Sequence, residues 1–280
     1  MSDQRVSLDG IRVGLSISDS PDLIRLGLDK EHVHDAVITL ATALLAKGGE
    51  IAYGGDLRPQ GFTRTLIRSA QMYNDTRQAG DSRSFAKIFS YLAGVVRQNW
   101  TASDRVKCRR EFEGAVAIID DFPAPGNPDL VDPWPASLTS MRERITDDCR
   151  AYVFMGGQVT NFKGALPGIA EEALLMLKKK KPIYLVGGFG GCTSDLIKSI
   201  WGLKPPVDLD REAAKNDSRY LKALEQIAPF RDHFPNNGLT LEENHALAAM
   251  DDSNQFLPMI LRGISKACQT KKNIERKKGA

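Results

Sequence analysis

The sequence has few cysteines and none of the spacings that metal sites and disulfide frameworks use. Four cysteines occur in 280 residues, far apart and with no CxxC pair. This pattern fits a reducing compartment and argues against a disulfide framework or a structural zinc site. Of the four histidines only His32 and His34 are close, and their i, i+2 spacing points them apart on a helix. We therefore expect no metal site, and we expect no cofactor.

The sequence also lacks a secretory signal and any long apolar stretch. A membrane-spanning helix needs about 20 consecutive apolar residues, so we expect a cytoplasmic protein with no membrane partner. Strong charge is missing too, because the net charge is only +3. We therefore expect no nucleic-acid partner. The two basic runs, residues 178–181 and 271–278, are interpreted as a helix end, where cations favour the dipole, and a solvated tail.

Neither of the two common nucleotide-binding signatures is present. The sequence contains no G-x-G-x-x-G, which marks dinucleotide-binding folds, and no G-x-x-x-x-G-K-[ST], which marks phosphate-loop enzymes. A standard dinucleotide dehydrogenase and a phosphate-loop NTPase are therefore disfavoured.

What the sequence does contain is a regular alternation of short apolar runs and amphipathic stretches. The apolar runs predict strands at 11–18, 50–53, 86–92, 115–119, 151–155 and 182–186. Helical spacing predicts helices at 30–47, from about 63, at 137–148, at 165–179, before Trp201, and near 241–251 and 255–268. This alternation indicates an α/β fold, a Rossmann-like and mostly parallel sheet with helices on both faces.

We divide the chain into two parts. Residues 1–203 are predicted to form a nucleotide-binding domain, and residues 204–280 a C-terminal helical extension packed on the same domain. Residues 204–240 are polar and broken by prolines, and the run 115–119 is interpreted as a buried strand. The proline-rich segment 123–135 is too stiff for a helix or a central strand, so it is either a lid-like functional loop or a surface arm.

Glycine-rich loops follow several of these strands and open helices. Such a junction offers unpaired backbone N–H groups and the positive end of a helix dipole, which suits a phosphate. The loops lie at residues 54–63, 155–172 and 187–193. The first strand ends instead in Ser16, Ser18 and Asp19, which are either ligand contacts or part of a turn.

The loop at 54–63 carries several candidate ligand groups. Gly54 and Gly55 allow close backbone approach or positive φ. Asp56 would accept ribose hydroxyls and Arg58 would pair with a phosphate. Thr63 would cap the following helix or hydrogen-bond the ligand. A plain turn remains the alternative reading of Gly-Gly-Asp.

The loop at 155–172 has the largest set of candidates. Arg142, in the preceding helix, would supply positive charge, unless it is a surface arginine. Glu171 and Glu172 fall in the first helical turn, where they would stabilise the dipole or reach a bound sugar. The remaining candidates in this loop and the next are Gly156, Gly157, Lys163, Gly164, Pro167, Gly168 and Gly188.

Loops that follow parallel strands share one edge of the sheet, and ligands bind there at the point where the strand order reverses. The three glycine loops therefore predict one crevice for a phosphate-bearing, nucleotide-like molecule.

Several of these segments also carry a family resemblance. They are residues 15–18, 53–63, 138–142, 156–157 and 164–172 and, in the tail, 238–244 and 261–263. The chain resembles the SLOG superfamily, the Rossmann-like group that contains the Lonely Guy cytokinin-activating hydrolases and the DNA-processing protein DprA. Its tail resembles that of large prokaryotic members encoded beside TIR and other immune effectors. The resemblance implies a homo-oligomer and a TIR-type or other effector encoded separately.

Lonely Guy enzymes hydrolyse the N-glycosidic bond of nucleoside monophosphates with a PGGxGTxxE loop and an upstream arginine–lysine pair. By resemblance, Gly156 and Gly157 match the two glycines, and Arg142 matches one basic position. Glu171 or Glu172 matches the acid.

The sequence departs from this pattern in two places. Met141 stands where an arginine is expected beside Arg142, and the loop is stretched, so that Thr160 is displaced. These departures favour binding over hydrolysis.

Two ligand-related functions therefore remain open, beside a structural or oligomer-forming protein with a degenerate site, against which the three glycine loops argue. The first is a sensor or signal-binding protein for an NAD-derived or cyclic ADP-ribose-like ligand, with a role in antiphage immunity, as the resemblance implies. The second is a phosphoribohydrolase acting on nucleoside monophosphates. Glu171 or Glu172 would then be catalytic, stabilising oxocarbenium-like charge or orienting water, and Arg142 would fix the phosphate.

Overall fold

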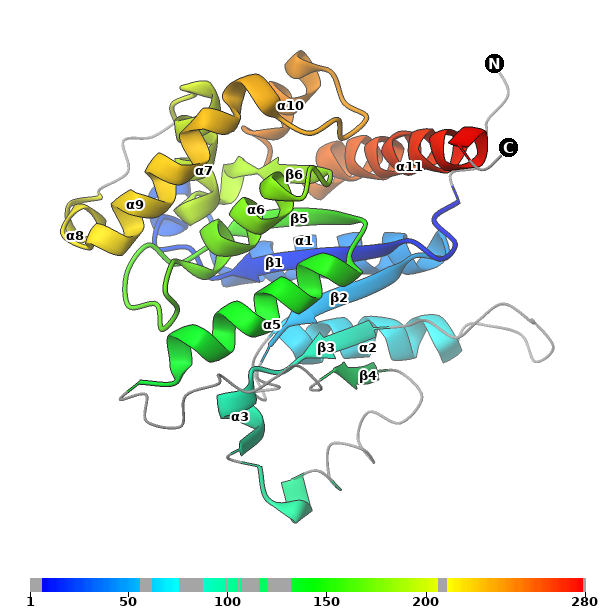
Figure 1. Ribbon diagram of the computed structural model, residues 1–280, viewed down its shortest axis with the longest axis horizontal. Coiled ribbons are helices and arrows are strands. Elements are labelled where there is room, and N and C mark those ends of the chain that lie inside the picture. The colour runs from blue at the N-terminus through cyan, green and yellow to red at the C-terminus, as the bar shows by residue number, and fades with distance from the viewer. Residues whose placement is uncertain are drawn as a thin grey trace.

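The computed structural model describes residues 7–55, 62–75, 88–98, 100–104, 106, 116–119, 132–205 and 211–278. They contain a sheet of six parallel strands in the order β4-β3-β2-β1-β5-β6, with helices on both faces (Figure 1). The strands are β1 (Arg12–Ser18), β2 (Glu50–Gly54), β3 (Ile88–Tyr91), β4 (Val116–Ile119), β5 (Ala151–Gly156) and β6 (Ile183–Val186). The predicted fold class, a Rossmann-like α/β fold with a C-terminal helical extension, is confirmed.

The helices divide between the two faces of the sheet. In Figure 1, α5 and α6 lie on the near face and α1 on the far face. The helices are α1 (Lys30–Ala46), α2 (Phe62–Asp75), α3 (Gly94–Gln98), α5 (Trp134–Asp148), α6 (Gly168–Lys178), α7 (Gly191–Trp201), α8 (Glu212–Lys215), α9 (Ser218–Ile227), α10 (Leu241–Leu247) and α11 (Ser253–Lys278).

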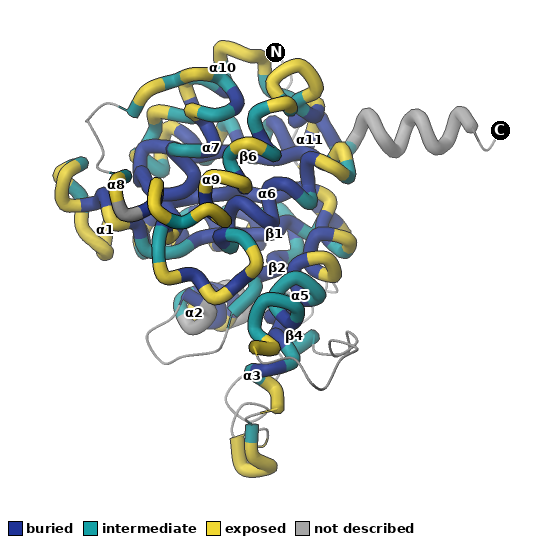
Figure 2. Tube along the Cα trace, turned by 60° about the vertical axis from the view of Figure 1, so that its left-hand side comes forward, coloured by how far each residue is buried: buried dark blue, intermediate teal, exposed yellow. Residues whose placement is uncertain are grey.

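Alternation along the strands builds a separate core on each face. Val13, Leu15 and Ile17 of β1 are buried in one core with the apolar side of α1. Tyr152 and Phe154 of β5 are buried in the other, beneath α5, α6 and α7. Figure 2 shows these central strands as the buried interior of the molecule.

Small residues on the α5 and α6 face make room for larger groups above the sheet. Gly14 lies beside Tyr152, and a Cβ at Gly14 would be 2.1 Å from the tyrosine ring. Ala52 and Gly54 lie on the same face of β2. Tyr152, Met141 and Glu172 fill the space that these small residues leave near the carboxyl ends of β1 and β2, where the candidate site lies.

The strand order reverses between β1 and β5, which pair with each other while their later neighbours run outward in opposite directions. Ser18, at the end of β1, pairs in register with Gly156, at the end of β5. This edge is where open α/β sheets bind ligands.

Two details of the sequence interpretation differ from the structure. The strand at 115–119 was expected to be buried, but β4 is an edge strand in which Ala117 is exposed and the other three residues are half-buried. Residues 204–240 are polar and broken by prolines, as described, but no helix was predicted in them and they contain α9. Asp217 caps α9 by accepting the Arg219 N–H at 2.9 Å, and Tyr220 is buried against the body.

The C-terminal segment shares its core with the sheet. Leu247 of α10 and Phe256, Ile260 and Ile264 of α11 belong to the same buried cluster as Val186 of β6. In the described part of the chain, no helix is both long and apolar enough to cross a membrane.

Gly188 gives a test of how tightly this segment packs. A Cβ at Gly188 would be 2.3 Å from the carbonyl oxygen of Met250, which accepts the Gly188 N–H at 3.1 Å. Overpacking of this kind costs about 1–3 kcal/mol, so Gly188→Ala is expected to lower the free energy of unfolding in urea by that amount. Gly94→Ala is the control, because its Cβ would lie 3.4 Å from Ser137 Oγ. Equal stability of the two variants would contradict the packing.

Candidate functional site

Three of the predicted segments meet at the reversal of the strand order. The Gly157 N–H donates to the Ser18 carbonyl at 3.1 Å, and the Cys192 N–H donates to the Gly157 carbonyl at 3.1 Å. Gly156 and Gly157 have φ of 63° and 106°, which favour glycine. A Cβ at Gly191 would be 2.4 Å from the Gly157 carbonyl oxygen. The structure therefore brings the ends of β1 and β5 and the loop after β6 into direct contact.

A buried carboxylate of the protein occupies the loop after β6. Asp22 Oδ2 accepts the Gly191 N–H at 2.6 Å, at the N-terminus of α7. Arg211 holds the same carboxylate with two hydrogen bonds, of 2.6 and 2.7 Å, and also donates to Asp195 at 2.7 Å. The neighbouring Gly188 N–H is bonded to Met250. Two N–H groups that the sequence offered to a phosphate thus bind protein oxygens instead.

Arg142 of α5 lies against the loop at 155–172. Its side chain is 10 % exposed, and Nη1 pairs with Glu171 Oε2. Thr139 donates its hydroxyl hydrogen to Oε1 of the same carboxylate. Cβ atoms at Gly164 and Gly168 would lie 2.5 Å from Nη1 and 2.9 Å from Nη2, respectively. The two glycines therefore let the loop close directly over the guanidinium.

Arg142 combines an unfavourable position at a helix N-terminus with a hydrogen-bond donor that no described residue uses. Gly168 is the first residue of α6, so the guanidinium lies at the positive end of that helix dipole, where a cation is disfavoured. Pro167 gives the helix no side-chain cap. Arg142 Nε is buried and has no hydrogen-bond partner among the described residues. Glu171 pairs directly with the guanidinium, and the Arg142 charge also acts on Glu172, so the feature that suits an added anion is the buried Nε donor beside the helix N-terminus.

Glu172 lies deeper, above the small residues of β1 and β2. It is 6 % exposed, and a Cβ at Gly54 would lie 3.7 Å from its Oε1. Burial raises the pKa of Glu172 to about 7, against the opposing effects of the Arg142 charge and the Ser16 and Tyr152 hydroxyl groups. At neutral pH this carboxyl is therefore partly protonated, and it can both donate and accept a hydrogen bond.

The raised pKa predicts a stability that falls as the pH rises. The ordinary pKa is 4.5 and the folded pKa about 7, so this stabilisation is complete below 4.5 and is lost as the pH rises through 7. The loss is roughly 3 kcal/mol, since one pKa unit corresponds to about 1.4 kcal/mol. The unfolding free energy of Glu172→Gln is expected to fall less than that of the wild type between about pH 5 and pH 8. An equal fall in both proteins would contradict the burial of a titrating carboxyl.

The other predicted ligand residues lie around this centre or outside it. The Gly55 N–H donates to the Tyr91 carbonyl at 3.3 Å, and Asp19 pairs with Lys30 at 3.1 Å. Lys163 Nζ lies 4.0 Å from the centroid of the Trp134 ring, which fixes the loop to the start of α5. Asp56 and Arg58 lie outside the described residues, and so does the side chain of Thr63.

Some residues of the site were not predicted. Thr139 donates to Glu171, and Asp22 and Arg211 bridge the loop after β6 to the C-terminal segment. A hydroxyl one helical turn before Arg142 was a usable signal for Thr139. For Arg211 no local pattern marks a partner 189 residues away.

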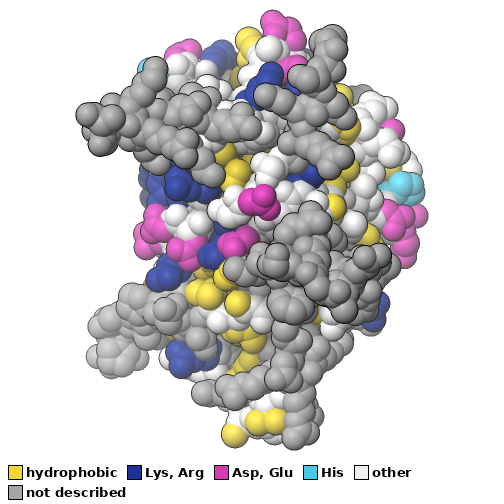
Figure 3. All heavy atoms as spheres, turned by 90° about the vertical axis from the view of Figure 1, so that its right-hand side faces the viewer, with side chains coloured by type: hydrophobic (Ala, Val, Ile, Leu, Met, Phe, Trp, Pro, Cys, Tyr) yellow, Lys and Arg dark blue, Asp and Glu magenta, His cyan; other side chains and the backbone are white. Residues whose placement is uncertain are grey.

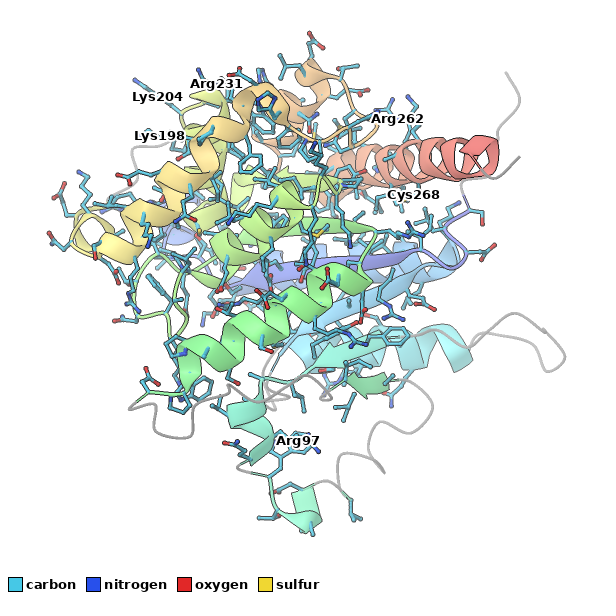
Figure 4. All side chains as sticks on the ribbon, viewed as in Figure 1. Arg97, Lys198, Lys204, Arg231, Arg262 and Cys268 are labelled. Carbon is cyan, nitrogen blue, oxygen red and sulfur yellow. The ribbon has the colours of Figure 1, made fainter. Side chains whose placement is uncertain are left out.

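Two basic residues outside the site donate hydrogen bonds to backbone carbonyls at helix ends. Lys181 Nζ donates to the Thr146, Asp147 and Cys149 carbonyls at 2.7–2.9 Å and closes α5. Arg231, which Figure 4 shows near Lys198 at the end of α7, donates to the Ile200 carbonyl at 2.8 Å. On the face in Figure 3, described cations and carboxylates are interspersed.

Within the described residues, no three His, Cys, Asp or Glu side chains gather as metal ligands.

A doubly wound parallel sheet with a buried arginine and two carboxylates at its reversal point defines a Rossmann-like ligand-binding protein. The chain belongs to the SLOG family, because the model of SLOG cluster2 matches residues 7–247. No curated protein matches the chain. Membership in the SLOG family indicates that the protein binds or processes a nucleotide-related ligand.

Proposed function

We propose that the protein is a sensor that binds a nucleotide-derived signal, NAD-derived or cyclic ADP-ribose-like, without consuming it. The observation that supports this is Arg142, a buried guanidinium at the N-terminus of α6 with an unengaged Nε. A phosphate of the ligand would accept from Arg142 and from the backbone of Gly168.

The state of Glu171 favours binding over hydrolysis. A hydrolase needs a carboxylate that holds a water beside the anomeric carbon. Both oxygens of Glu171 are engaged, one by Arg142 and one by Thr139. In this proposal Glu171 fixes the arginine, and Glu172 receives a ribose hydroxyl.

Glu172 supports the alternative, a Lonely Guy-like phosphoribohydrolase. A carboxyl with a pKa of about 7 is partly protonated at neutral pH, and the protonated form can deliver its proton to a leaving base. Hydrolysis would require the Glu172 carboxyl to lie within hydrogen-bonding distance of the leaving base when the nucleotide is bound.

A further part of the proposal concerns partners. The sensor would act as a homo-oligomer and signal to a separately encoded effector, TIR-type or other, in antiphage immunity. These expectations come from the family resemblance, and they extend the binding proposal without being needed for it.

Incubation with a nucleotide panel tests the proposal. AMP, ADP-ribose, NAD and cyclic ADP-ribose isomers are added to the protein, melting shifts are recorded, and the nucleotides are recovered for chromatography. The sensor proposal expects a melting shift with at least one nucleotide that is recovered unchanged. Release of base or ribose phosphate that is lost in Glu172→Gln would overturn it in favour of the hydrolase. A panel with neither shift nor product would overturn both.

A further inference from the structure

An open hollow lies against the same loop that packs on Arg142. It is an open cavity of about 430 Å³ between the loop at 155–172 and the N-terminus of α9. Its lining residues are Thr160, Asn161, Asn216, Asp217 and Ser218. The volume is within the range of about 300–1,000 Å³ that small-molecule sites occupy.

The cavity and the Arg142 site share one loop. Asn161 lines the cavity, and Gly164, three residues later, closes over the Arg142 guanidinium. Because consecutive Cα atoms are 3.8 Å apart, the Cα atoms of these two residues lie within about 11 Å of each other. Arg219 of α9 donates to the Gly164 carbonyl at 3.2 Å and stacks on Phe162, so α9 also braces this loop.

The two sites differ in chemistry. Four of the five lining residues are neutral hydroxyl or amide side chains, and none of the five is a lysine or arginine. Asp217, the acid among them, accepts hydrogen bonds of 2.7–3.1 Å from Arg219, which hold its pKa below the ordinary value. The cavity therefore suits a neutral group with several hydrogen-bonding atoms, whereas Arg142 suits a phosphate.

We infer that this cavity is a second subsite, which takes a ribosyl or nucleoside group attached to the phosphate held at Arg142. The inference rests on the proposed function and deepens it, because it selects ligands with a sugar or base beyond the phosphate. It also gives the stretched loop a role. The residues that separate Gly157 from Pro167 form a cavity wall from Thr160 and Asn161.

The test compares two probes that share a diphosphate. Pyrophosphate carries the charge alone, and ADP-ribose adds sugars and a base. The double variant Asn216→Ala, Ser218→Ala removes hydrogen-bonding side chains from the cavity and keeps the Asp217 cap of α9. Each lost hydrogen bond weakens binding severalfold, so calorimetry is expected to show about a tenfold loss of affinity for ADP-ribose. The affinity for pyrophosphate is expected to change less than about twofold.

Lys222→Ala, on the exposed side of α9, is the matched control and should leave both affinities unchanged. Wild-type affinity of the double variant for ADP-ribose, or an equal loss for both probes, would overturn the subsite and leave the binding proposal standing. A wild-type protein that binds neither probe would overturn the subsite, because the subsite requires a phosphate group bound at Arg142. The nucleotide panel would then show whether the proposed function fails with it.

Discussion

Arg142→Ala is expected to lower the affinity for the bound nucleotide by at least about a hundredfold. Removing one member of a buried, hydrogen-bonded charge pair costs about 2–5 kcal/mol. In this site the loss would include the phosphate contact and would leave Glu171 buried without its guanidinium partner. Isothermal titration calorimetry with the nucleotide that gives the largest melting shift measures the effect.

Two further variants distinguish a loss of phosphate binding from a loss of folding. Arg142→Lys preserves the charge but removes the planar fork, so an intermediate affinity is expected with a normal circular dichroism spectrum. Arg144→Ala is the control on the same helix, since Arg144 forms a half-exposed pair with Asp148. Unchanged affinity in a folded Arg142→Ala protein would show that the phosphate is held elsewhere.

Asp22→Ala is expected to lower the free energy of unfolding in urea by about 3–5 kcal/mol, more than the other substitutions proposed for stability. The Asp22 side chain is 4 % exposed and accepts from both Arg211 and the Gly191 N–H. Its removal would take from Arg211, whose side chain is 12 % exposed, the carboxylate that accepts two of its hydrogen bonds, and would uncap the first turn of α7.

An exposed ion pair of the same segment gives the control for Asp22. Glu212→Ala breaks the pair between Glu212 and Lys215, whose side chains are 75 % and 60 % exposed. Exposed pairs contribute roughly 0–1 kcal/mol. If Asp22→Ala is no more destabilising than Glu212→Ala, the buried network does not fasten the C-terminal segment to the site.

The sequence predicted the sheet well because its signals are local. Buried strands such as β5 and β6 are short apolar runs, and Gly48 ends α1 with φ of 83°. β4 was harder because four apolar residues look alike at an edge and in a centre. β6, at the other edge, is nevertheless buried because Val186 packs with α10 and α11, so only long-range packing distinguishes the two edge strands.

The candidate site was predictable in part. Arg142 and the pair Glu171 and Glu172 were found from their place beside a glycine loop, and the structure brings them together. Their division of roles was not predictable, because adjacent carboxylates on a helix point in different directions. One binds the arginine, and the other is buried above Gly54. Asp22 binds the N–H of Gly191 in the loop after β6, and Arg211 holds Asp22 in place. No local sequence pattern around Arg211 predicts this contact.

The nuclear magnetic resonance signal of the Arg142 Nε–H group tests the central claim most directly. The signal is assigned by its absence from Arg142→Lys and followed while the nucleotide that gives the largest melting shift is added. If Arg142 holds the phosphate, this signal moves in step with saturation and with the ³¹P signal of the ligand, because a phosphate oxygen engages a donor that has no partner in the described structure. A nucleotide that saturates the protein while the Arg142 signal stays in place would contradict the account.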